Sequence, residues 1–347
     1  MPRQITLKHV ATKAGVRPET VSKVINGKAQ VSPETEARIR QAIRELGYRP
    51  NLTARSLRTR QSRMIGYSWR PVPADQFNPI LDKFLQSMVE AAGHVGYHIL
   101  PFPCPPDRAQ VEAYQEMVDT NRVDGFILSS TNVDDQRIAY LQKIQFPFVA
   151  FGRANEDWDF PYIDVDGTAG LRAATEHLLS LGHRRIAVIA WPEDSHTGAL
   201  RFQGYREAMV AADLPIDPAW ITRGQHSAAF GRSAAAGLLN LPSSRCPTAI
   251  VALSDLMAIG AMNAIQDRGL EVGRDVAVIG FDDVPMAQYL RPPLTTLRQP
   301  VWEIGQRVIA MLLQLLNGKP LTERHILIAP ELIRRASSGE PGAEATA

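Results

Sequence analysis

The chain has 347 residues, too many for one ordinary domain, and its 45% hydrophobic content is typical of a globular protein. Its apolar runs are shorter than the ~18 residues of a membrane helix, and its basic N-terminus lacks the apolar core of a signal peptide. Cys104 and Cys246 lie far apart without metal-ligand spacing, which favours a reducing, cytoplasmic location with no membrane.

The net charge of +2 conceals an uneven distribution of charge along the chain. The residues up to Arg63 include 14 Lys and Arg against 4 acidic residues, whereas the remainder has 24 against 32. If the N-terminal basic residues formed only an ordinary solvated surface, the excess of acidic residues in the rest of the chain would have no explanation. A basic N-terminal unit is instead what binding to DNA phosphates requires.

The N-terminal stretch predicts two short helices joined by a turn, followed by a third helix. Apolar residues recur at helical spacing between a capping Thr6 and a terminating Gly15, and Pro18 starts the second helix. The third helix begins after Ser32 and ends at Gly47. This pattern is typical of a helix-turn-helix, which presents its second helix to a DNA major groove.

Three short motifs follow one another in this unit: Thr20-Val21-Ser22 with Asn26-Gly27, then Val31-Ser32-Pro33-Glu34-Thr35, then Leu46-Gly47-Tyr48-Arg49-Pro50-Asn51. Each is weak alone. Together, at the start of a chain of this length, they resemble the LacI/GalR family of bacterial repressors. The resemblance continues to Arg335 and so covers nearly the whole chain.

The resemblance implies that the second helix reads bases. Glu19 can accept a hydrogen bond from cytosine N4, and Lys23 can donate to guanine O6 and N7. Glu19 has an alternative role as a surface acid that favours the helix N-terminus. Arg17 stands where the family commonly has a capping Ser, which favours a phosphate contact. The expected DNA contacts are Thr6, Arg17, Pro18, Glu19, Thr20, Ser22, Lys23, Asn26, Asn51, Arg55 and Leu57.

Residues 51–62 resemble the hinge helix of the family. Leu57 matches the leucine that enters the minor groove, where an inserted side chain unstacks a base step and bends the duplex. A segment this short and basic does not hold a helix alone in water, so DNA is expected to order it.

From Met64 onward, short apolar strands alternate with amphipathic helices, which predicts parallel sheets covered on both faces. The predicted strands are 65–69, 97–100, 125–129, 148–151, 186–190, 249–253 and 276–281. The predicted helices are 80–92, 110–121, 168–181, 201–212, 230–239, 255–268 and 302–316.

The fold class is therefore α/β, and the resemblance implies two doubly wound lobes of a periplasmic-binding-protein-like fold, with three chain crossings between them. We expect a helix-turn-helix domain at 1–50, a hinge at 51–62, an effector-binding and dimerisation domain at 63–338, and a disordered tail at 339–347. The expected N-lobe is 63–164 with 294–324, and the expected C-lobe is 165–291 with 325–338.

Ligands of such folds bind beyond the carboxyl ends of the strands, in the cleft. Arg201 begins an Arg-x-x-Gly-aromatic motif whose Arg contacts effector in the family, and Asp282 matches a sugar-binding Asp. A carboxylate can accept from two neighbouring hydroxyls while a guanidinium donates to their oxygens. The expected effector-binding residues are Phe77, Asn78, Arg201, His226, Ser254 and Asp282.

Other residues near the expected cleft have weaker assignments. Gly152 replaces an Asp that contacts effector in one member of the family. Trp191 supplies a flat apolar surface that suits a sugar ring. Asp164 and Asp166 are interpreted as a hinge turn at a lobe crossing rather than as a metal site.

The sequence thus predicts a homodimeric transcriptional repressor that binds operator DNA and responds to a small-molecule effector, a mono- or disaccharide, without a cofactor or metal. Motifs such as Gly-x-Ser-x-Gly, a phosphate-binding loop and His-Glu-x-x-His are absent, which argues against an enzyme. Two alternatives stand: a purine- or nucleoside-responsive co-repressor protein of the same fold, and a cytosolic solute-binding module that does not bind DNA. Two directions of effector action also stand as alternatives. The effector releases the repressor from DNA, or it promotes DNA binding.

Overall fold

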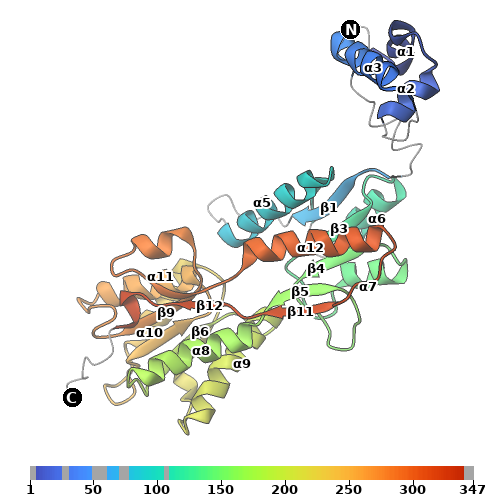
Figure 1. Cartoon of the computed structure of the whole chain (residues 1–347). Helices are drawn as coiled ribbons and strands as arrows, with labels where there is room; N and C mark the ends of the chain where they lie inside the picture. Colours follow the sequence, from blue (N-terminus) through green and yellow to red (C-terminus); the bar gives the residue numbers. More distant parts are fainter. Residues whose placement is uncertain (1–4, 26–30, 49–60, 70–77, 105–108, 340–347) are drawn as a thin grey trace. The chain divides into compact units, whose positions relative to one another are not determined.

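The computed structural model describes residues 5–25, 31–48, 61–69, 78–104 and 109–339. The chain divides into two compact units, Met1–Ser62 and Arg63–Ala347 (Figure 1). Five expected site residues lie outside the described residues: Asn26, Asn51, Arg55, Leu57 and Phe77.

The N-terminal unit contains helices α1 (Leu7–Ala14), α2 (Pro18–Ile25) and α3 (Pro33–Leu46). Gly15 ends α1 with a φ of 64°, a left-handed conformation that glycine adopts without strain. Ser32 caps α3, because its Oγ accepts a hydrogen bond from the Thr35 backbone N–H at 3.3 Å. The helices enclose a small apolar core of Val10, Ala11, Ala14, Val21, Val24, Ile39 and Ala42.

The second unit contains two six-stranded sheets. The first sheet has the order β11-β5-β4-β3-β1-β2 and is parallel throughout. Its strands are β1 (Met64–Trp69), β2 (His98–Pro103), β3 (Gly125–Leu128), β4 (Phe148–Phe151), β5 (Tyr162–Val165) and β11 (His325–Ile328).

The second sheet has the order β12-β10-β9-β8-β6-β7, and only its edge strand β12 is antiparallel to its neighbour among the described pairs. Its strands are β6 (Ile186–Ala190), β7 (Ile221–Arg223), β8 (Ala249–Ala252), β9 (Ala277–Asp282), β10 (Thr295–Arg298) and β12 (Glu331–Ile333). Each sheet with its helices is called the first or the second lobe below.

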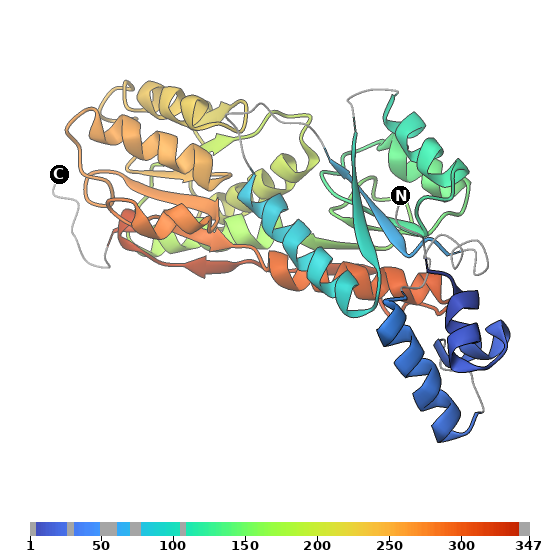
Figure 2. The ribbon, with the colours of Figure 1, turned by 90° about the horizontal axis from the view of Figure 1, so that it is seen from above.

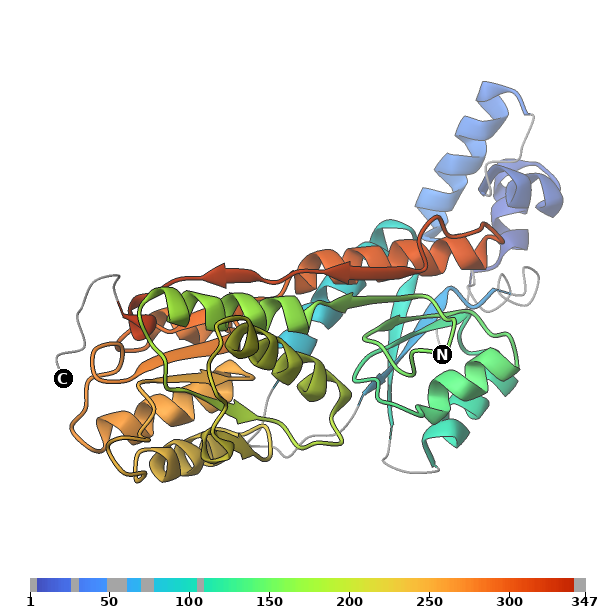
Figure 3. The same cartoon turned by 90° about the horizontal axis from the view of Figure 1, so that it is seen from below.

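Helices cover both sheets and complete the α/β fold class that the sequence predicts. The helices of the first lobe are α5 (Pro79–His94), α6 (Ala109–Asp119), α7 (Gln136–Lys143) and α12 (Val301–Leu316), of which α5 and α12 pack together (Figure 2). Those of the second lobe are α8 (Gly167–Ser180), α9 (His196–Ala211), α10 (Ala228–Leu238) and α11 (Asp255–Gln266), and α8 lies beside α9 (Figure 3). Short 3₁₀ helices are η1 (Pro218–Trp220), η2 (Pro285–Tyr289) and η3 (Ala336–Ser338). Within the described ranges, no helix combines the length and apolar character that crossing a membrane requires.

The chain crosses between the lobes three times, but two crossings differ from the predicted boundaries. β10 pairs with β9, so residues 295–298 belong to the second lobe and the crossing follows at Gln299–Pro300. β11 pairs with β5, so residues 325–328 belong to the first lobe and the last crossing precedes β12. The sequence predicts the second lobe boundary at Pro292-Pro293. In the structure these prolines instead precede the short strand β10, whose Thr295 and Thr296 are buried.

Candidate functional site

The exposed face of α2 carries the side chains that the sequence assigns to base reading. Glu19 and Lys23 are exposed and lie one helical turn apart, on the opposite face from the buried Val21 and Val24. Arg17, directly before α2, is also exposed. The helix therefore presents charged groups of both signs on the side that a helix-turn-helix turns toward bases.

The remaining described candidates of this unit lie around that face. Pro18, Thr20 and Ser22 are half-buried on α2. Thr6 is exposed at the N-terminus of α1, where its backbone N–H donates to His9 Nδ1 at 3.0 Å. Pro18, Thr20 and Ser22 therefore lie beside the exposed face of α2. The Thr6 side chain lies at the surface, at the start of α1.

A cavity of about 140 Å³ lies between the carboxyl ends of strands from the two lobes. Gly152 after β4 and Asp164 in β5 line it from the first lobe. Arg201 on α9, His226 and Asp282 at the end of β9 line it from the second lobe. Four of the expected effector residues, Asn78, Arg201, His226 and Asp282, are thus brought together.

Arg201 is buried between polar and aromatic partners. Its guanidinium carbon lies 3.6 Å from the centroid of the Phe281 ring and 4.8 Å from that of Trp191. Its Nη1 donates to the Leu253 carbonyl and lies 3.7 Å from Asp282 Oδ1. Burial lowers the pKa of Arg201, and the Asp282 carboxylate opposes that shift. In the described part of the chain, Arg201 Nε has no hydrogen-bond partner.

Asp282 is held in a strained conformation at the cavity wall. Its φ of 127° lies in the region that residues other than glycine adopt only at a cost of roughly 1–3 kcal/mol. Its Oδ1 accepts a hydrogen bond from Gln299 Nε2 at 2.6 Å. Burial raises the pKa of Asp282 to about 6, although Arg201 and Gln299 favour the ionised form. The site thus keeps a desolvated carboxylate beside two donors, poised to accept hydrogen bonds from a ligand.

Trp191 and His226 form an aromatic wall of the same cavity. Their ring centroids are 5.4 Å apart and the rings are tilted by 53°. Burial lowers the pKa of His226 to about 4, and the positive charge of Arg201 adds to that effect. His226 is therefore neutral near pH 7. Trp191 Nε1 is buried without a partner among the described residues, so it is a donor available to a ligand.

Asn78 and Ser254 both cap helices, but only Asn78 reaches the cavity. Asn78 Oδ1 accepts from the backbone N–H groups of Ile80 and Leu81, each at 3.2 Å. Ser254 is fully buried and does not line the cavity, because its Oγ accepts from the Met257 backbone N–H at 3.3 Å as the cap of α11. In this structure Ser254 serves as a helix cap, and its expected contact with effector stays a prediction.

Asp164 is a first-lobe carboxylate of the cavity that was not among the expected effector-binding residues. The interpretation of Asp164 as part of a hinge turn is wrong, because Asp164 lies in β5 and lines the cavity. Its Oδ2 accepts from Arg153 Nε at 2.8 Å, and its Oδ1 accepts from the Val165 backbone N–H at 2.8 Å. Asp166 does mark the crossing, where it caps α8 through the Ala169 N–H. A polar residue near the carboxyl end of a short strand was the available signal.

A second buried carboxylate, Asp255, lies behind Asp282. Its Oδ1 accepts from Thr296 Oγ1, and its Oδ2 accepts from the Val284 backbone N–H at 2.8 Å. Burial raises the pKa of Asp255 to about 7, and the neighbouring Asp282 charge adds to the rise. Asp255 braces the loop after β9 and does not line the cavity.

Asp283, next to Asp282, also braces this loop. Its carboxylate accepts from Arg298 Nε and from Arg335 Nη2, each at 2.7 Å.

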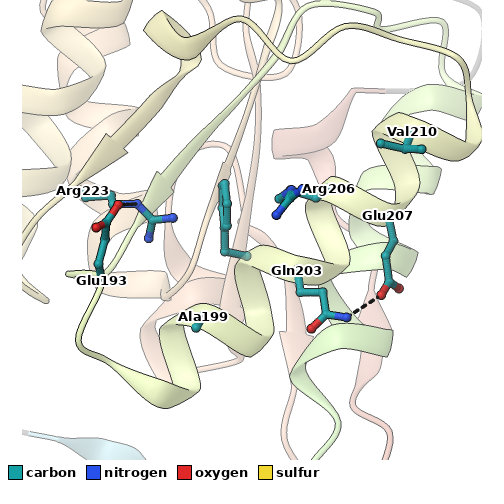
Figure 4. A pocket seen from close by; sticks show the side chains of 8 residues that line it. Glu193, Ala199, Gln203, Arg206, Glu207, Val210 and Arg223 are labelled. Carbon is teal, nitrogen blue, oxygen red and sulfur yellow. Dashed lines mark hydrogen bonds and ion pairs between the residues drawn. The ribbon is translucent and has the colours of Figure 1, made fainter.

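A larger cavity, about 590 Å³, lies on the outer face of α9 (Figure 4). Its polar groups largely pair with one another, since Gln203 donates to Glu207 at 2.8 Å and Arg223 lies 3.5 Å from Glu193. The smaller cavity combines buried charges with unpartnered donors, so it is the better ligand site. Across the described ranges, no group of three His, Cys, Asp or Glu side chains is placed to hold a metal ion.

Comparison with known protein families matches two segments of the chain. Residues 6–51 match the family described as bacterial regulatory proteins, lacI family, and residues 175–338 match a periplasmic binding protein-like domain.

Similar proteins span almost the whole chain. The HTH-type transcriptional repressor PurR of Aliivibrio fischeri is 32% identical, over 96% of this chain and 98% of the relative. The HTH-type transcriptional regulator CelR of Thermobifida fusca is 34% identical, with the same coverage of each chain.

Solved structures agree with these relatives. A regulatory protein of the LacI family from Chloroflexus aggregans is 53% identical, with a TM-score of 0.77 over 80% of this chain and 99% of that one. A complex of the regulator CelR with cellobiose is 32% identical, with a TM-score of 0.73 over 96% and 99%. The lac repressor dimer bound to operator and an anti-inducer is 29% identical, with a TM-score of 0.85 over 97% and 100%.

The two relatives exceed 30% identity and each covers 96% of this chain. The chain therefore belongs to the lacI family of bacterial regulatory proteins, and it is a transcriptional regulator rather than an enzyme.

Proposed function

We propose that this regulator is a homodimeric repressor whose affinity for its operator is controlled by a sugar bound in the cavity of about 140 Å³. The observation that carries the proposal is the pairing of Asp282 and Arg201 at the cavity wall, 3.7 Å apart and almost fully buried. A carboxylate accepts from neighbouring hydroxyls while a guanidinium donates to their oxygens, which is the pattern a sugar presents.

The remaining wall of the cavity supports the same ligand class. Trp191 Nε1 and Arg201 Nε are buried donors without partners in the described protein, and hydroxyl oxygens are suitable acceptors for both. The rings of Trp191 and His226 offer apolar surface to the face of a sugar ring. The solved complex of CelR with cellobiose shows a sugar bound to a relative, which supports a carbohydrate here as well.

For DNA binding, we propose that Glu19 and Lys23 on α2 read base edges, while Arg17 contacts phosphate. Leu57 lies outside the described residues, and its role as a minor-groove wedge in a hinge at 51–62 is proposed from the sequence. A relative solved as a dimer on operator DNA supports a dimer for this chain.

In the proposed mechanism, the effector closes the two lobes on each other. Because it contacts both lobes, it binds the closed arrangement better than the open one and shifts the equilibrium between them. The hinge segments of the dimer then pair or separate, which changes operator affinity.

The proposal is tested by calorimetry on the full-length protein with a panel of mono- and disaccharides, alongside hypoxanthine, guanine and adenosine as competing candidates. The sugar that binds is then added to an operator-binding titration at fixed salt. The expected result is binding of a sugar, with operator affinity changed in either direction.

A control variant separates ligand binding from DNA binding. Asp282→Ala should bind operator like the wild type and no longer respond to the sugar, because the buried hydroxyls and Arg201 lose their acceptor. Binding of purines but not sugars would reject the proposed effector class, and undiminished sugar affinity of Asp282→Ala would place the site elsewhere.

A further inference from the structure

A buried ion pair lies in the interior of the first lobe. Arg137 on α7 and Asp135 at the start of that helix are both almost completely buried. Arg137 Nε donates to Asp135 Oδ1 at 2.9 Å, and its Nη2 donates to Asp135 Oδ2 at 2.7 Å. Burial alone would raise the pKa of Asp135, but the hydrogen bonds and the charge of Arg137 outweigh burial and lower it. The pair therefore stays charged near neutral pH.

The rest of the Arg137 guanidinium holds a stretch of backbone. Its Nη2 also donates to the carbonyls of Ser129 and Ser130, each at 3.2 Å, and its Nη1 donates to Ser68 Oγ at 3.3 Å. The two carbonyls directly follow β3, whereas Ser68 belongs to β1. A guanidinium carries five N–H donors in a planar fork, so one side chain can bond a carboxylate and two carbonyls at once. Arg137 thus joins α7 to β1 and to the segment that follows β3.

Stability alone does not explain a charged pair at this place. Taking two charges out of water is costly, and replacing a buried pair by apolar side chains of similar size is often neutral or stabilising. An apolar side chain at position 137 would have neighbours to pack against, since Leu141, one turn further along α7, lies in the apolar core of the same lobe. What an apolar side chain could not do is hold the carbonyls of Ser129 and Ser130.

The backbone that Arg137 holds forms a tight turn at the cavity. Ser130 has a φ of 51°, in the left-handed region that residues other than glycine rarely adopt. After this turn, Thr131 Oγ1 donates to the Arg153 carbonyl beyond the end of β4, at 2.7 Å. Gly152 makes room for that contact, because a Cβ there would lie 2.5 Å from Thr131 Oγ1. Ser130, Thr131 and Gly152 line the cavity, whereas Arg137 does not reach it.

We infer that Arg137 is a positioning residue: by holding the two carbonyls after β3, it sets the turn that presents Ser130 and Thr131 to the cavity. Arg137 acts on a ligand only through this turn. The inference rests on the proposed function, because the turn belongs to the cavity proposed for the effector. The turn itself can be followed without any ligand, so the two proposals can fail separately.

Two variants remove the hold on the turn. Asp135→Asn combined with Arg137→Met discharges the pair, and the Asn can keep the cap of α7, in which the Asp135 side chain accepts from the backbone N–H of residue 137. Arg137→Lys keeps the charge, but a single ammonium nitrogen cannot bond the carboxylate and both carbonyls in the same geometry. It gives a second reading if the double variant folds poorly.

Ser68→Ala is the matched control. It takes one hydrogen-bond partner from Arg137 within the same buried cluster, but it leaves both carbonyls held. Ser68 does not line the cavity. If Arg137 served only the stability of the lobe, Ser68→Ala would resemble the Arg137 variants in kind. If Arg137 sets the turn, only the Arg137 variants should disturb it.

The first measurement is hydrogen exchange of the full-length proteins without ligand, followed by mass spectrometry. In this structure the Asp134 backbone N–H donates to Asn155 Oδ1 at 2.6 Å, which closes the turn onto the segment after β4. Exchange over residues 130–135 should become about tenfold or more faster in both Arg137 variants and stay at the wild-type rate in Ser68→Ala. Exchange over β4 is the reference and should change by a smaller factor. An unchanged rate over 130–135, or equal acceleration of both segments, would overturn the inference.

The second measurement is calorimetry with D-glucose, D-galactose, cellobiose, lactose, hypoxanthine, guanine and adenosine. For a compound that binds the wild type, both Arg137 variants should lower the affinity about tenfold or more, and Ser68→Ala should bind like the wild type. Undiminished affinity in both Arg137 variants would overturn the inference and leave the proposed function intact. If none of these compounds binds the wild type, the proposed function fails, and hydrogen exchange alone decides whether Arg137 sets the turn.

Discussion

Replacing Asp255 by Asn should flatten part of the pH dependence of the stability of the unit that follows Ser62. Asp255 is fully buried, and burial together with the Asp282 charge raises its pKa from the ordinary 3.8 to about 7. Between these two values, the folded protein holds a proton that the unfolded chain has released. The free energy of unfolding therefore falls as the pH rises from about 4 to about 7.

The size of the effect follows from the proton count. One proton contributes about 1.4 kcal/mol per pH unit while the folded state holds it and the unfolded state does not. Because Asp255 is half ionised near pH 7, its contribution between pH 5 and pH 7 is a loss of about 2 kcal/mol. Asn has no such proton to lose. Its side-chain oxygen can accept from Val284 N–H, and its amide can donate to Thr296 Oγ1.

His226 makes the comparison with the wild type necessary. Burial lowers the pKa of His226 to about 4, so the unfolded chain binds a proton that the folded state excludes between about 4 and 6.5. Stability from this source rises with pH, opposite to the contribution of Asp255. The wild-type curve contains both effects together with that of Asp282, whose pKa is also raised, to about 6. The difference between variant and wild type removes the His226 contribution and reports Asp255 together with its interaction with Asp282.

The assay is denaturant unfolding of the full-length proteins at about pH 5, 6 and 7, followed by tryptophan fluorescence. All five Trp residues follow Arg63, so the signal reports on the second unit alone. The free energy of unfolding of the variant, relative to the wild type, should rise by about 2 kcal/mol from pH 5 to pH 7. A difference that stays constant across this range would refute the assignment of a raised pKa to Asp255.

Further predictions concern DNA binding and packing. Leu57→Ala should weaken operator binding without changing sugar affinity, because a lost wedge forfeits contacts to bent DNA, and equal operator affinities at matched salt would contradict it. Lys23→Ala should relax preference at one base pair per half-site by roughly 1–3 kcal/mol, as measured with single-base operator variants; a uniform loss on all sequences would indicate a phosphate contact instead. Gly204→Ala should lower the melting temperature, because an added Cβ would overlap the Thr168 carbonyl where α8 and α9 meet. This backbone clash costs roughly 1–3 kcal/mol, and an unchanged melting temperature would show that the helices can separate freely.

The elements with strong apolar periodicity were predictable from the sequence. The predicted strands 148–151 and 186–190 coincide with β4 and β6, because each is an apolar run with clear boundaries and becomes almost wholly buried. The edge strands β11 and β12 mix exposed and half-buried residues over only four and three positions, which is too short for a periodicity to emerge. The eight-residue α7 was missed because it is similarly short.

The site was predictable where a motif coincided with the end of a buried strand. Asp282 satisfies that condition and lines the cavity, whereas Arg201 lines the cavity from within α9 and was indicated by its motif alone. Ser254 also follows a buried strand, but a serine directly before a helix is committed to capping it, and that local hydrogen bond decided its orientation. Asp164 escaped prediction because its strand did, and its partnership with Arg153 depends on the pairing of β4 with β5, which spacing along the chain does not reveal.

The three crossings of the chain determine the order in which the protein can fold during synthesis. The helix-turn-helix elements end at Leu46, so they are synthesised before either sheet begins at Met64. The first lobe waits for α12 and β11, and the second waits for β12, which ends at Ile333. Neither lobe is a continuous segment, so both sheets are completed close together in synthesis, only after residues 325–333 have been made. A chain interrupted before residue 325 would carry a finished DNA-binding unit attached to two incomplete sheets with open edges.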